Sequence, residues 1–597
     1  MNTSYIAHDC EAPRSEQDPA QLSAIKMLKP VLFCLFLVAT TAAKGQSPQF
    51  LVSGADEELL RNIQNHVRLA SLSCDATQSR VGNLLPRIRQ QIVRASRALG
   101  YYQLRHRVTA SREGECWVIN AEIEPGEPVT VGSVEIEVLS NEGFFTAAIG
   151  NPPLQTGQQL NQQNYERIKG QLNSVAVEQG FFDARLVESS LDLDLEANVA
   201  AATIRFDPGE RYRFGEFRIQ EQNALDPAFI SRYMEAESGD YFSSETLLEL
   251  RRSLDQSLYF SRVQIVPLHH QAEDKRVPLD VLLSLRPQHA FTLGGGATTD
   301  IGPRLRANYE NRYFTPDGHR LTVNSSASPV QQQLDFGYEI PLADPRTQRL
   351  SFDLGGLRED VDAFTTRTGK IGASYTFIDS FDWRRDYSLN FQHDEYQLND
   401  NQKETADLLI PGISFTRTEA DDTLYPTRGW RLYGKLHGAQ ESLLSTESFL
   451  QLNVAGKLVH SFGPGRFLFK LEAGTTLVDD VLDLPVSLQY FSGGDQSVRG
   501  YKYQSLGPIN DEGEVTGGKH QLVTGIEYDF GIRPNWKLAV FADAGNAFND
   551  FTDMEFKKSA GVGVRWLSPI GPIRVDFASA LDNDNDIRIH VSMGPDL

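Results

Sequence analysis

Near its C-terminus the chain reads Ile587-Arg588-Ile589-His590-Val591-Ser592-Met593, an unbroken alternation of apolar and polar side chains. Successive side chains of a β-strand point to opposite faces, so this stretch predicts a strand with one apolar and one polar face. The segments 467–473, 561–566 and 572–579 alternate in the same way, with charged residues on the polar face. The C-terminal half of the chain is therefore predicted to be β-structure.

Sixteen segments of this kind follow one another from residue 288 onward. We expect them to begin near residues 290, 303, 317, 331, 348, 368, 383, 408, 429, 449, 466, 519, 537, 559, 571 and 586. Each strand and its connection take about 19 residues, which suits membrane-spanning strands of about 9–11 residues. One connection, 477–518, is much longer and would be the sixth external loop. The prediction is a 16-stranded antiparallel transmembrane β-barrel over 288–597.

A soluble β-sandwich would show the same alternation, so periodicity alone leaves both folds open. Two observations favour the membrane barrel. Charge recurs on the inward face of strand after strand, as a water-filled lumen allows, and the chain carries an export signal. No segment after residue 46 approaches the roughly 18 consecutive apolar residues of a membrane-spanning helix, so a helical membrane protein is not expected.

The export signal lies in 27–46, where Lys29 precedes an apolar run from Val31 to Ala39 and then small residues. This order is typical of a secretory signal peptide. An anchoring helix is the alternative, but the run is short for a span of about 20 residues. Because residues 1–26 are polar and acidic, we expect Met27 to be the true start and 1–46 to be an extension plus signal.

Two of the four cysteines, Cys10 and Cys34, lie in this leader, and Cys74 and Cys116 remain in the exported chain. An even pair in an oxidising compartment predicts a disulfide between Cys74 and Cys116. Two buried free thiols are the alternative. A metal site is not expected, because two cysteines without a nearby histidine pair fall short of a zinc ligand set.

The first half of the chain contains a repeat of about 80 residues. Aromatic pairs at Tyr101-Tyr102, Phe181-Phe182 and Tyr259-Phe260 each follow a stretch of helical periodicity and precede a strand. A second phrase, Pro125-Gly126-Glu127, recurs as Pro208-Gly209-Glu210. Each repeat predicts a module with the order strand–helix–helix–strand–strand.

We place these three α+β modules at 49–125, 126–207 and 208–287, and interpret the aromatic pairs as core residues without chemistry. A small sheet with a free edge can bind an extended peptide through its backbone, by strand addition. The chain of 597 residues has 57 Lys and Arg against 79 Asp and Glu, a net charge of −22. That balance argues against a nucleic-acid partner, which needs a concentrated basic surface.

The long connection contains Val498-Arg499-Gly500-Tyr501. This phrase resembles the signature of the superfamily of outer-membrane assembly and two-partner secretion proteins, whose periplasmic modules are POTRA domains. Three further stretches look like late-barrel motifs of that superfamily, in the same order: Leu424–Trp430, Phe541–Phe548 and Gly571–Phe577. The resemblance covers nearly all of the exported chain.

The resemblance implies that the sixth loop folds back into the lumen and that Arg499 pairs with Asp543. Asp543 shares the strand parity of Lys537 and so faces inward, and a guanidinium can bind a carboxylate through two parallel hydrogen bonds. Glu527 is a second possible partner, and Gly500 would let the loop turn sharply. The alternative is a mobile surface loop with a solvated Arg499.

The resemblance also implies that the first and last strands pair weakly and form a lateral gate. A run of glycines packs no side chains against a neighbour and weakens pairing; the alternative is that it relieves crowding at a bend. The gate residues that we expect are Gly294, Gly295 and Gly296 in the first strand, and Ile589, Val591 and Gly594 at the last.

The function implied is that of an outer-membrane assembly factor in a Gram-negative bacterium, with its modules in the periplasm. Three modules and the closing Ser592–Leu597 look most like the outer-membrane subunit of translocation and assembly modules. That likeness implies a TamB-like partner anchored in the inner membrane, unfolded β-barrel or autotransporter clients, and outer-membrane lipid. The alternatives are a two-partner-type transporter exporting a dedicated substrate, a passive porin, and lipid delivery.

Enzyme signatures are missing from the sequence. No Gly-Lys-Ser/Thr follows Gly294–Gly296, no HExxH or GxSxG occurs, and the calcium-loop-like stretch 582–586 lacks the required glycine. We therefore expect no enzymatic activity, no cofactor and no metal.

Overall fold

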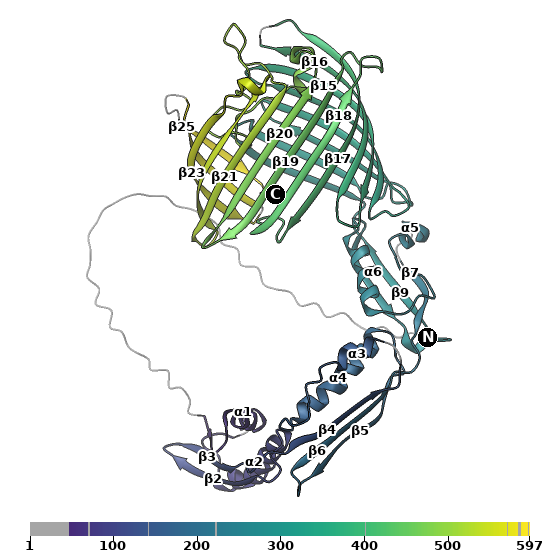
Figure 1. The fold of residues 1–597 in the computed structure, drawn as a ribbon, viewed down its shortest axis with the longest axis vertical. Helices are drawn as coiled ribbons and strands as arrows, with labels where there is room; N and C mark the ends of the chain where they lie inside the picture. The colour runs from purple at the N-terminus through teal and green to yellow at the C-terminus, as the bar shows by residue number, and fades with distance from the viewer. Residues whose placement is uncertain are drawn as a thin grey trace, which may run out of the picture. The chain divides into compact units, whose positions relative to one another are not determined.

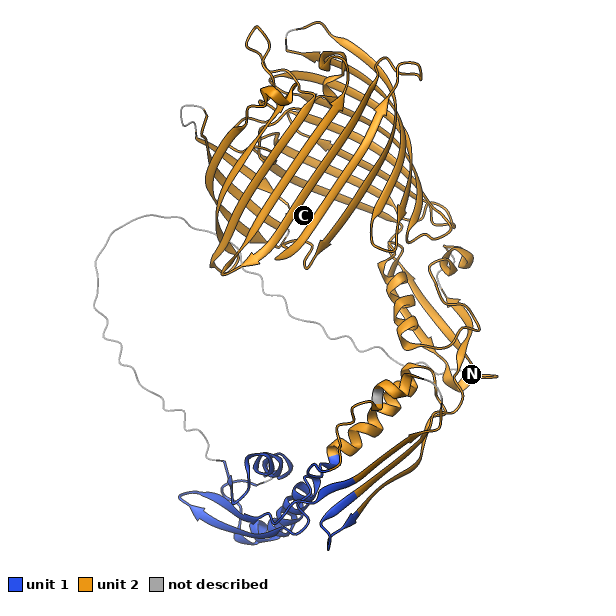
Figure 2. Ribbon diagram, viewed as in Figure 1, with its two compact units in different colours: residues 1–132, 157–162, 193–200 blue, residues 133–156, 163–192, 201–597 orange. Residues whose placement is uncertain are grey.

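A computed structural model of the chain describes residues 47–69, 72–140, 143–220, 224–399, 401–569, 571–582, 587–594 and 596 (Figure 1). The extension and signal peptide expected at 1–46, which contain Cys10, Met27 and Cys34, lie outside the described residues. The contacts divide the chain into two compact units (Figure 2). One comprises residues 1–132, 157–162 and 193–200, and the other comprises 133–156, 163–192 and 201–597.

Three small sheets precede the barrel, and each follows the predicted order of strand, two helices and two strands. The first contains β1 (Gln49–Ser53), α1 (Glu57–His66), α2 (Gln78–Ala98), β2 (Arg105–Glu113) and β3 (Cys116–Glu124). The second contains β4 (Thr130–Val138), α3 (Gly143–Ile149), α4 (Gln162–Glu178), β5 (Arg185–Asp194) and β6 (Val199–Asp207). The third contains β7 (Arg213–Gln220), α5 (Pro227–Ser231), α6 (Ser244–Gln256), β8 (Phe260–Pro267), η1 (His269–Gln271) and β9 (Arg276–Leu285).

The last strand of each module lies in the middle of its sheet, in the orders β1-β3-β2, β4-β6-β5 and β7-β9-β8. The helices form because their apolar residues recur at helical spacing, and side chains such as Asp56 and Thr77 cap the first backbone N–H groups of α1 and α2. Tyr101, Phe181 and Tyr259 are buried. The first residue of each aromatic pair therefore packs in a module core, as the sequence predicted. No helix in the described part of the chain is long and apolar enough to cross a membrane.

The C-terminal half forms one sheet of sixteen consecutive antiparallel strands that curls into a nearly closed barrel (Figure 1). Every strand begins within four residues of its predicted start. The first eight strands are β10 (His289–Thr298), β11 (Gly302–Asn311), β12 (Arg320–Ala327), β13 (Gln331–Pro341), β14 (Gln348–Asp360), β15 (Phe364–Ile378), β16 (Arg384–Leu398) and β17 (Glu404–Ala420). The last eight are β18 (Arg428–Ala439), β19 (Phe449–Phe462), β20 (Gly465–Leu477), β21 (His520–Arg533), β22 (Trp536–Phe548), β23 (Lys557–Ser568), β24 (Gly571–Ala580) and β25 (Ile587–Met593).

The two faces of the barrel wall differ as the alternation predicted. In β25, Ile587 and Ile589 are 67% and 53% exposed on the outer face, whereas His590 and Ser592 are buried on the inner face. Exposed Leu, Ile and Phe side chains recur along the other strands. An apolar outer band around a polar interior is the pattern of an outer-membrane barrel.

The third module contacts the barrel at the turn between β11 and β12. The hydroxyl of Tyr259 donates to the carbonyl of Gly318 (2.6 Å), and the amide of Asp226 donates to the carbonyl of Pro316 (2.9 Å). Arg232 Nη1 donates to the carbonyl of Leu342 (3.1 Å). Module and barrel are thus joined by backbone and side-chain hydrogen bonds.

Candidate functional site

The connection between β20 and β21, residues 478–519, is packed inside the barrel, and we call it the inner loop. It contains two short helical turns, η2 (Val481–Asp483) and η3 (Val486–Leu488). Val498, Arg499 and Tyr501 are at most 7% exposed. An arginine buried this deeply needs ionic partners, because an unpaired buried charge is costly. The alternative of a solvated Arg499 does not describe this structure.

Arg499 binds Asp543 of β22 through two parallel hydrogen bonds. Its Nε donates to Asp543 Oδ2 (2.7 Å) and its Nη2 donates to Asp543 Oδ1 (3.0 Å). The ring of Phe541, two residues earlier on the same face, lies 3.4 Å from the guanidinium carbon. The bidentate geometry and the ring contact both favour arginine over lysine at this position.

Two further carboxylates complete the charge cluster. Arg499 Nη1 donates to Glu527 Oε2 of β21 (2.8 Å) and to Asp576 Oδ2 of β24 (3.2 Å). Arg565 of β23 joins the same two carboxylates, with Nε 2.9 Å from Glu527 Oε1 and Nη1 2.6 Å from Asp576 Oδ1. We call Arg499, Asp543, Glu527, Asp576 and Arg565 the lock.

The lock joins the inner loop to four consecutive strands. Burial opposes the charged form of Arg499, but Asp543, Glu527 and Asp576 together raise the pKa of Arg499 above its ordinary value, so the guanidinium stays charged. Lys470 of β20 adds a third cation, since its Nζ lies 3.9 Å from Asp543 and donates to the carbonyl of Gln496 (3.0 Å). The cluster holds the loop against the wall.

The neighbours of Arg499 complete the attachment. Val498 and Tyr501 pack with Leu506, Val523 and Ala580 in one apolar cluster. Gly500 has a φ of +93°, a left-handed conformation that glycine adopts without strain, and an added Cβ would lie 3.1 Å from the amide nitrogen of Ala580. In the Val-Arg-Gly-Tyr phrase, Val498 and Tyr501 thus share an apolar cluster, Arg499 binds the carboxylates of the wall, and Gly500 makes the turn.

The inner loop also binds β25 and the turn between β10 and β11, on the two sides of the open edge of the sheet. The amide of Gly500 donates to His590 Nε2 of β25 (2.8 Å), and the opposite nitrogen, Nδ1, donates to Asp495 Oδ1. Asp495 Oδ1 also accepts from Thr299 Oγ1 (2.6 Å), and the Asp495 amide donates to Asp300 Oδ2 (2.7 Å). We call Asp495, Asp300, Thr299 and His590 the clasp.

Asp300, Asp495 and His590 of the clasp are the one set of three or more acidic, cysteine or histidine residues, among the described residues, whose ligand atoms lie within 4.8 Å of one another. The Gly500 N–H fixes His590 Nε2 as an acceptor, so Nδ1 carries the proton. A metal would have to displace that proton and turn Nε2 into a second donor facing Gly500. The set therefore fits a hydrogen-bonded clasp better than a metal site.

The boundary between β10 and β25, which we call the seam, lacks regular pairing. In the described part of the chain the sheet runs from β10 to β25 in order, and no ladder joins its two ends. Gly294, Gly295 and Gly296 pair instead with Arg306, Leu305 and Arg304 of β11. The predicted glycine run therefore pairs regularly with β11 on one side, and on its other side it forms part of the edge that faces the seam.

The remaining predicted gate residues lie on the other side of the seam, in β25 or directly after it. The amide of Val591 donates to Thr299 Oγ1 (3.2 Å), and an added Cβ at Gly296 would lie 3.8 Å from Met593 Cε. Ile589 points to the outer face, and Gly594 has a φ of +138°. These contacts lie at one end of the seam.

The structure joins Cys74 and Cys116 by a disulfide in the first module. The bond links the segment before α2 to the start of β3. It lies in a different unit from the lock and the clasp.

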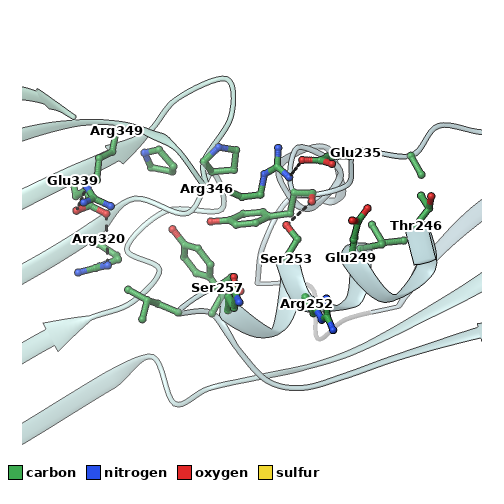
Figure 3. Close-up of a pocket in the computed structure, with 18 residues that line it drawn as sticks. Glu235, Thr246, Glu249, Arg252, Ser253, Ser257, Arg320, Glu339, Arg346 and Arg349 are labelled. Atoms are coloured by element: carbon green, nitrogen blue, oxygen red, sulfur yellow. Dashed lines mark hydrogen bonds and ion pairs between the residues drawn. The ribbon is translucent and has the colours of Figure 1, made fainter. Parts of the chain in front are cut away.

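A cavity of about 610 Å³ lies where the third module meets β12, β13 and β14 (Figure 3). Glu339 on β13 lies 3.6 Å from both Arg320 Nη1 and Arg349 Nε, and Arg346 pairs with Glu235 of the module. Because acidic and basic residues alternate around it, the cavity has no strong preference for either sign of charge.

Sequence reasoning found Arg499, Asp543 and Glu527 but did not assign Asp576, Arg565, Asp495, Asp300 or His590 to the site. The strand parity already placed Arg565, Asp576 and His590 on the inner face. It did not show which inner-face residues meet, because that depends on register across several strands and on the path of the loop.

The fold and the inner loop define a class of protein in which small α/β modules precede a 16-stranded barrel with a loop fixed inside it. Residues 303–596 match the family model of the Omp85 superfamily domain, and residues 49–125 match that of the POTRA domain described as TamA domain 1. The barrel is thus an Omp85 superfamily domain, and the first module is a POTRA domain.

Two curated relatives are named outer membrane protein assembly factor BamA. That of Nitratidesulfovibrio vulgaris is 24% identical over 383 residues, 60% of this chain and 48% of the relative. That of Neisseria meningitidis serogroup B is 22% identical over 520 residues, 75% of this chain and 64% of the relative. The chain therefore spans about half to two thirds of the length of these relatives.

A solved structure shares the fold. The crystal structure of BamA from Haemophilus ducreyi lacking POTRA domains 1–3 matches with a TM-score of 0.66 at 15% identity, covering 78% of this chain and 99% of that one. The match supports the architecture of modules followed by a nearly closed barrel.

Proposed function

We propose that this protein is an outer-membrane assembly factor that helps β-barrel proteins enter the outer membrane of a Gram-negative bacterium. The observation that carries the proposal is the seam, where among the described residues β10 has a hydrogen-bonded strand partner on one side only. The names of the two BamA relatives support it. An unpaired strand edge presents backbone donors and acceptors that another strand can satisfy.

The modules, facing the periplasm, would receive an unfolded client by strand addition at their sheet edges. The client would then add its first strands to the free edge of β10. Burial of apolar strand faces in lipid and completion of backbone hydrogen bonds supply the driving force, so the proposal includes no nucleotide, cofactor or enzymatic step.

The finer proposal is a protein similar to TamA, the outer-membrane subunit of the translocation and assembly module, acting on autotransporters with a TamB-like partner. Two observations support this finer proposal. The first module matches the POTRA domain described as TamA domain 1, and the number of modules before the barrel is three. Lipid delivery with the same partner is a second candidate. Export through the lumen is less well supported, because the inner loop would have to leave its ion pairs.

A disulfide engineered across the seam, between β10 and β25, tests the proposal. Cysteines replacing Gly296 and Met593 should form a disulfide under oxidation, and this should block insertion of a β-barrel client into liposomes that contain the full-length protein. A matched pair at Leu334 and Gly356, which already face each other in the β13–β14 ladder, should leave insertion unchanged under the same oxidation. Normal insertion through a fully cross-linked seam would refute the proposal.

A further inference from the structure

The first module differs in charge from the rest of the chain. Residues 49–125 contain ten arginines and eight acidic residues, a net charge of +2, whereas the whole chain has a net charge of −22. Five of these arginines lie in α2, which contains no aspartate, glutamate or lysine. This helix is therefore strongly basic in an otherwise acidic protein.

The basic residues of α2 gather on the side that points away from the module core. Ile88 and Ile92 are fully buried against that core. The opposite side of the helix carries five residues at spacings of four and three, which places them on one face. We call them the basic face: Asn83, Arg87, Gln90, Arg94 and Arg97. All five are exposed.

In the described part of the chain, the arginines of the basic face have no carboxylate partner. Arg87 and Arg94 form no hydrogen bond or ion pair with the described residues, and Arg97 lies over the ring of Tyr102, with its guanidinium carbon 5.9 Å from the ring centre. Arg94 and Arg97, three residues apart, are neighbours of like charge, an arrangement that destabilises a helix. A local cost of this kind without a compensating contact points to a function.

Two other exposed arginines of the module lie opposite acids. Arg105 and Arg107 of β2 face Glu124 and Glu122 of β3 across the antiparallel ladder. Cross-strand neighbours of opposite charge stabilise each other. The lack of nearby acids is therefore a property of the basic face and not of every exposed arginine in the module.

The chemistry of the basic face fits a phosphate-bearing surface. A guanidinium binds two phosphate oxygens through parallel hydrogen bonds, and the amides of Asn83 and Gln90 are additional donors. Arg87 and Arg97 lie about 15 Å apart along the helix axis, so the face presents a row of cations. A protein partner would need aromatic or aliphatic anchors, but no large hydrophobic side chain of α2, which is described throughout, is exposed.

We propose that the basic face of α2 docks the first module on an anionic phospholipid bilayer, with Arg87, Arg94 and Arg97 bound to lipid phosphates. Each basic residue near such a surface adds to the attraction, which falls off within a Debye length. The inference goes beyond the proposed function, because it concerns neither the seam nor the sheet edges that would receive a client.

Vesicle binding by the full-length protein tests the proposal. The protein is immobilised in phosphatidylcholine nanodiscs and exposed to phosphatidylcholine vesicles with about 30% anionic phosphatidylglycerol. We expect these vesicles to bind at an ionic strength of about 0.1 M and to dissociate at about 1 M, because salt screens the charges. The triple variant Arg87→Gln, Arg94→Gln, Arg97→Gln should bind them at least about tenfold more weakly. Unchanged binding in this variant, or equal binding of vesicles without phosphatidylglycerol, would overturn the proposal.

A second triple variant is the matched control for net charge. Arg105→Gln, Arg107→Gln and Arg112→Gln remove the same charge from exposed positions on β2 of the same module. This variant should keep most of the binding, because these arginines lie outside the basic face. An equal loss in the two glutamine variants would assign the binding to the net charge of the module and contradict the proposal.

A lysine variant separates loss of charge from loss of structure. Arg87→Lys, Arg94→Lys and Arg97→Lys keep the charge, and lysine, like glutamine, is a good helix former. Vesicle binding should therefore remain in this variant. Loss of binding in the lysine variant as complete as in the glutamine variant would count against electrostatic docking.

A soluble acidic polymer distinguishes a membrane from a protein partner. Binding of poly-glutamate through the three arginines, without binding of the vesicles, would assign the basic face to an acidic protein and overturn the proposal. Because no client takes part in these measurements, their outcome leaves the proposed function to be decided by the seam cross-link.

Discussion

At the scale of single residues, Arg499 carries the attachment of the inner loop. It is the only residue of the described inner loop that binds three carboxylates of the barrel wall: Asp543, Glu527 and Asp576. Two hydrogen bonds from its guanidinium and one from its backbone amide go to Asp543, so these two residues form the strongest single pair in the lock.

Arg499→Ala should lower the free energy of unfolding by about 3–5 kcal/mol, because it leaves buried carboxylates without a partner. Asp543→Ala should have a comparable effect, and the double variant should cost clearly less than the sum of the two. The measurement is the midpoint of unfolding in detergent, with the heat-dependent shift in electrophoretic mobility as the readout of unfolding. Lys502→Ala, which breaks an exposed pair with Asp362, is the control and should change little. Additive losses would contradict the pairing.

Because of the Asp300 carboxyl, we expect the free energy that holds the clasp closed to depend on pH. Burial, and next the charge of Asp495, raise the pKa of the Asp300 carboxyl to about 7. A carboxyl released from the clasp ionises near pH 3.9. Between about pH 4 and pH 7 the closed clasp therefore binds more protons than the released one. The free energy that holds the clasp closed falls as pH rises through this range and is constant above it.

Hydrogen exchange of the loop segment 492–501, corrected for intrinsic rates, should accordingly be faster at pH 7.5 than at pH 5. Asp300→Asn removes the titrating group and should give slow exchange at both pH values. The same pH dependence in Asp300→Asn would assign the effect to another group and contradict the prediction.

At the scale of elements, the β11–β12 turn fixes the third module on the barrel. Gly318 has a φ of +75°, and an added Cβ would lie 2.2 Å from Phe229 Cζ of α5. Gly318→Ala should therefore loosen α5 from the turn, through both backbone strain and the clash.

The expected result is faster proteolysis within α5 and the module core that contains Phe229. Gly513→Ala is a matched control, because Gly513 has a φ of +84° with nothing within 4 Å of an added Cβ. It carries only the backbone strain, of about 1–3 kcal/mol, and should leave the third module protected. Equal protease sensitivity in the two variants would show that the contact with Phe229 is unimportant.

The elements were largely predictable because strands and helices follow local rules. Period-two alternation located all sixteen strands, and it placed Asp543 on the inner face. The meeting of Asp495 with Asp300 and His590 was not predictable, since it joins residues 195 and 95 positions apart through a loop without regular structure. The alternation of side chains along β25 placed His590 on the inner face of the barrel. Alternation shows which face a side chain lies on, but it does not show which residue that side chain contacts.

At the scale of the whole molecule, the seam is held at one end and free at the other. The clasp joins the β10–β11 turn, the inner loop and β25, whereas in the described residues no strand pairs with His289–Gly295 on the side away from β11. A barrel with one unpaired edge differs from a fully closed barrel, which has no edge to offer. The central claim of our account is that an incoming strand pairs with this edge.

Photo-cross-linking from the edge itself tests that claim most directly. A photoreactive residue at Leu293 should cross-link to a β-barrel client during insertion into proteoliposomes. The same residue at Leu432, an outward-facing position 40% exposed on β18, should not. Our account predicts client adducts at Leu293 only. Efficient insertion with no adduct at Leu293, or with equal adducts at both positions, would contradict it.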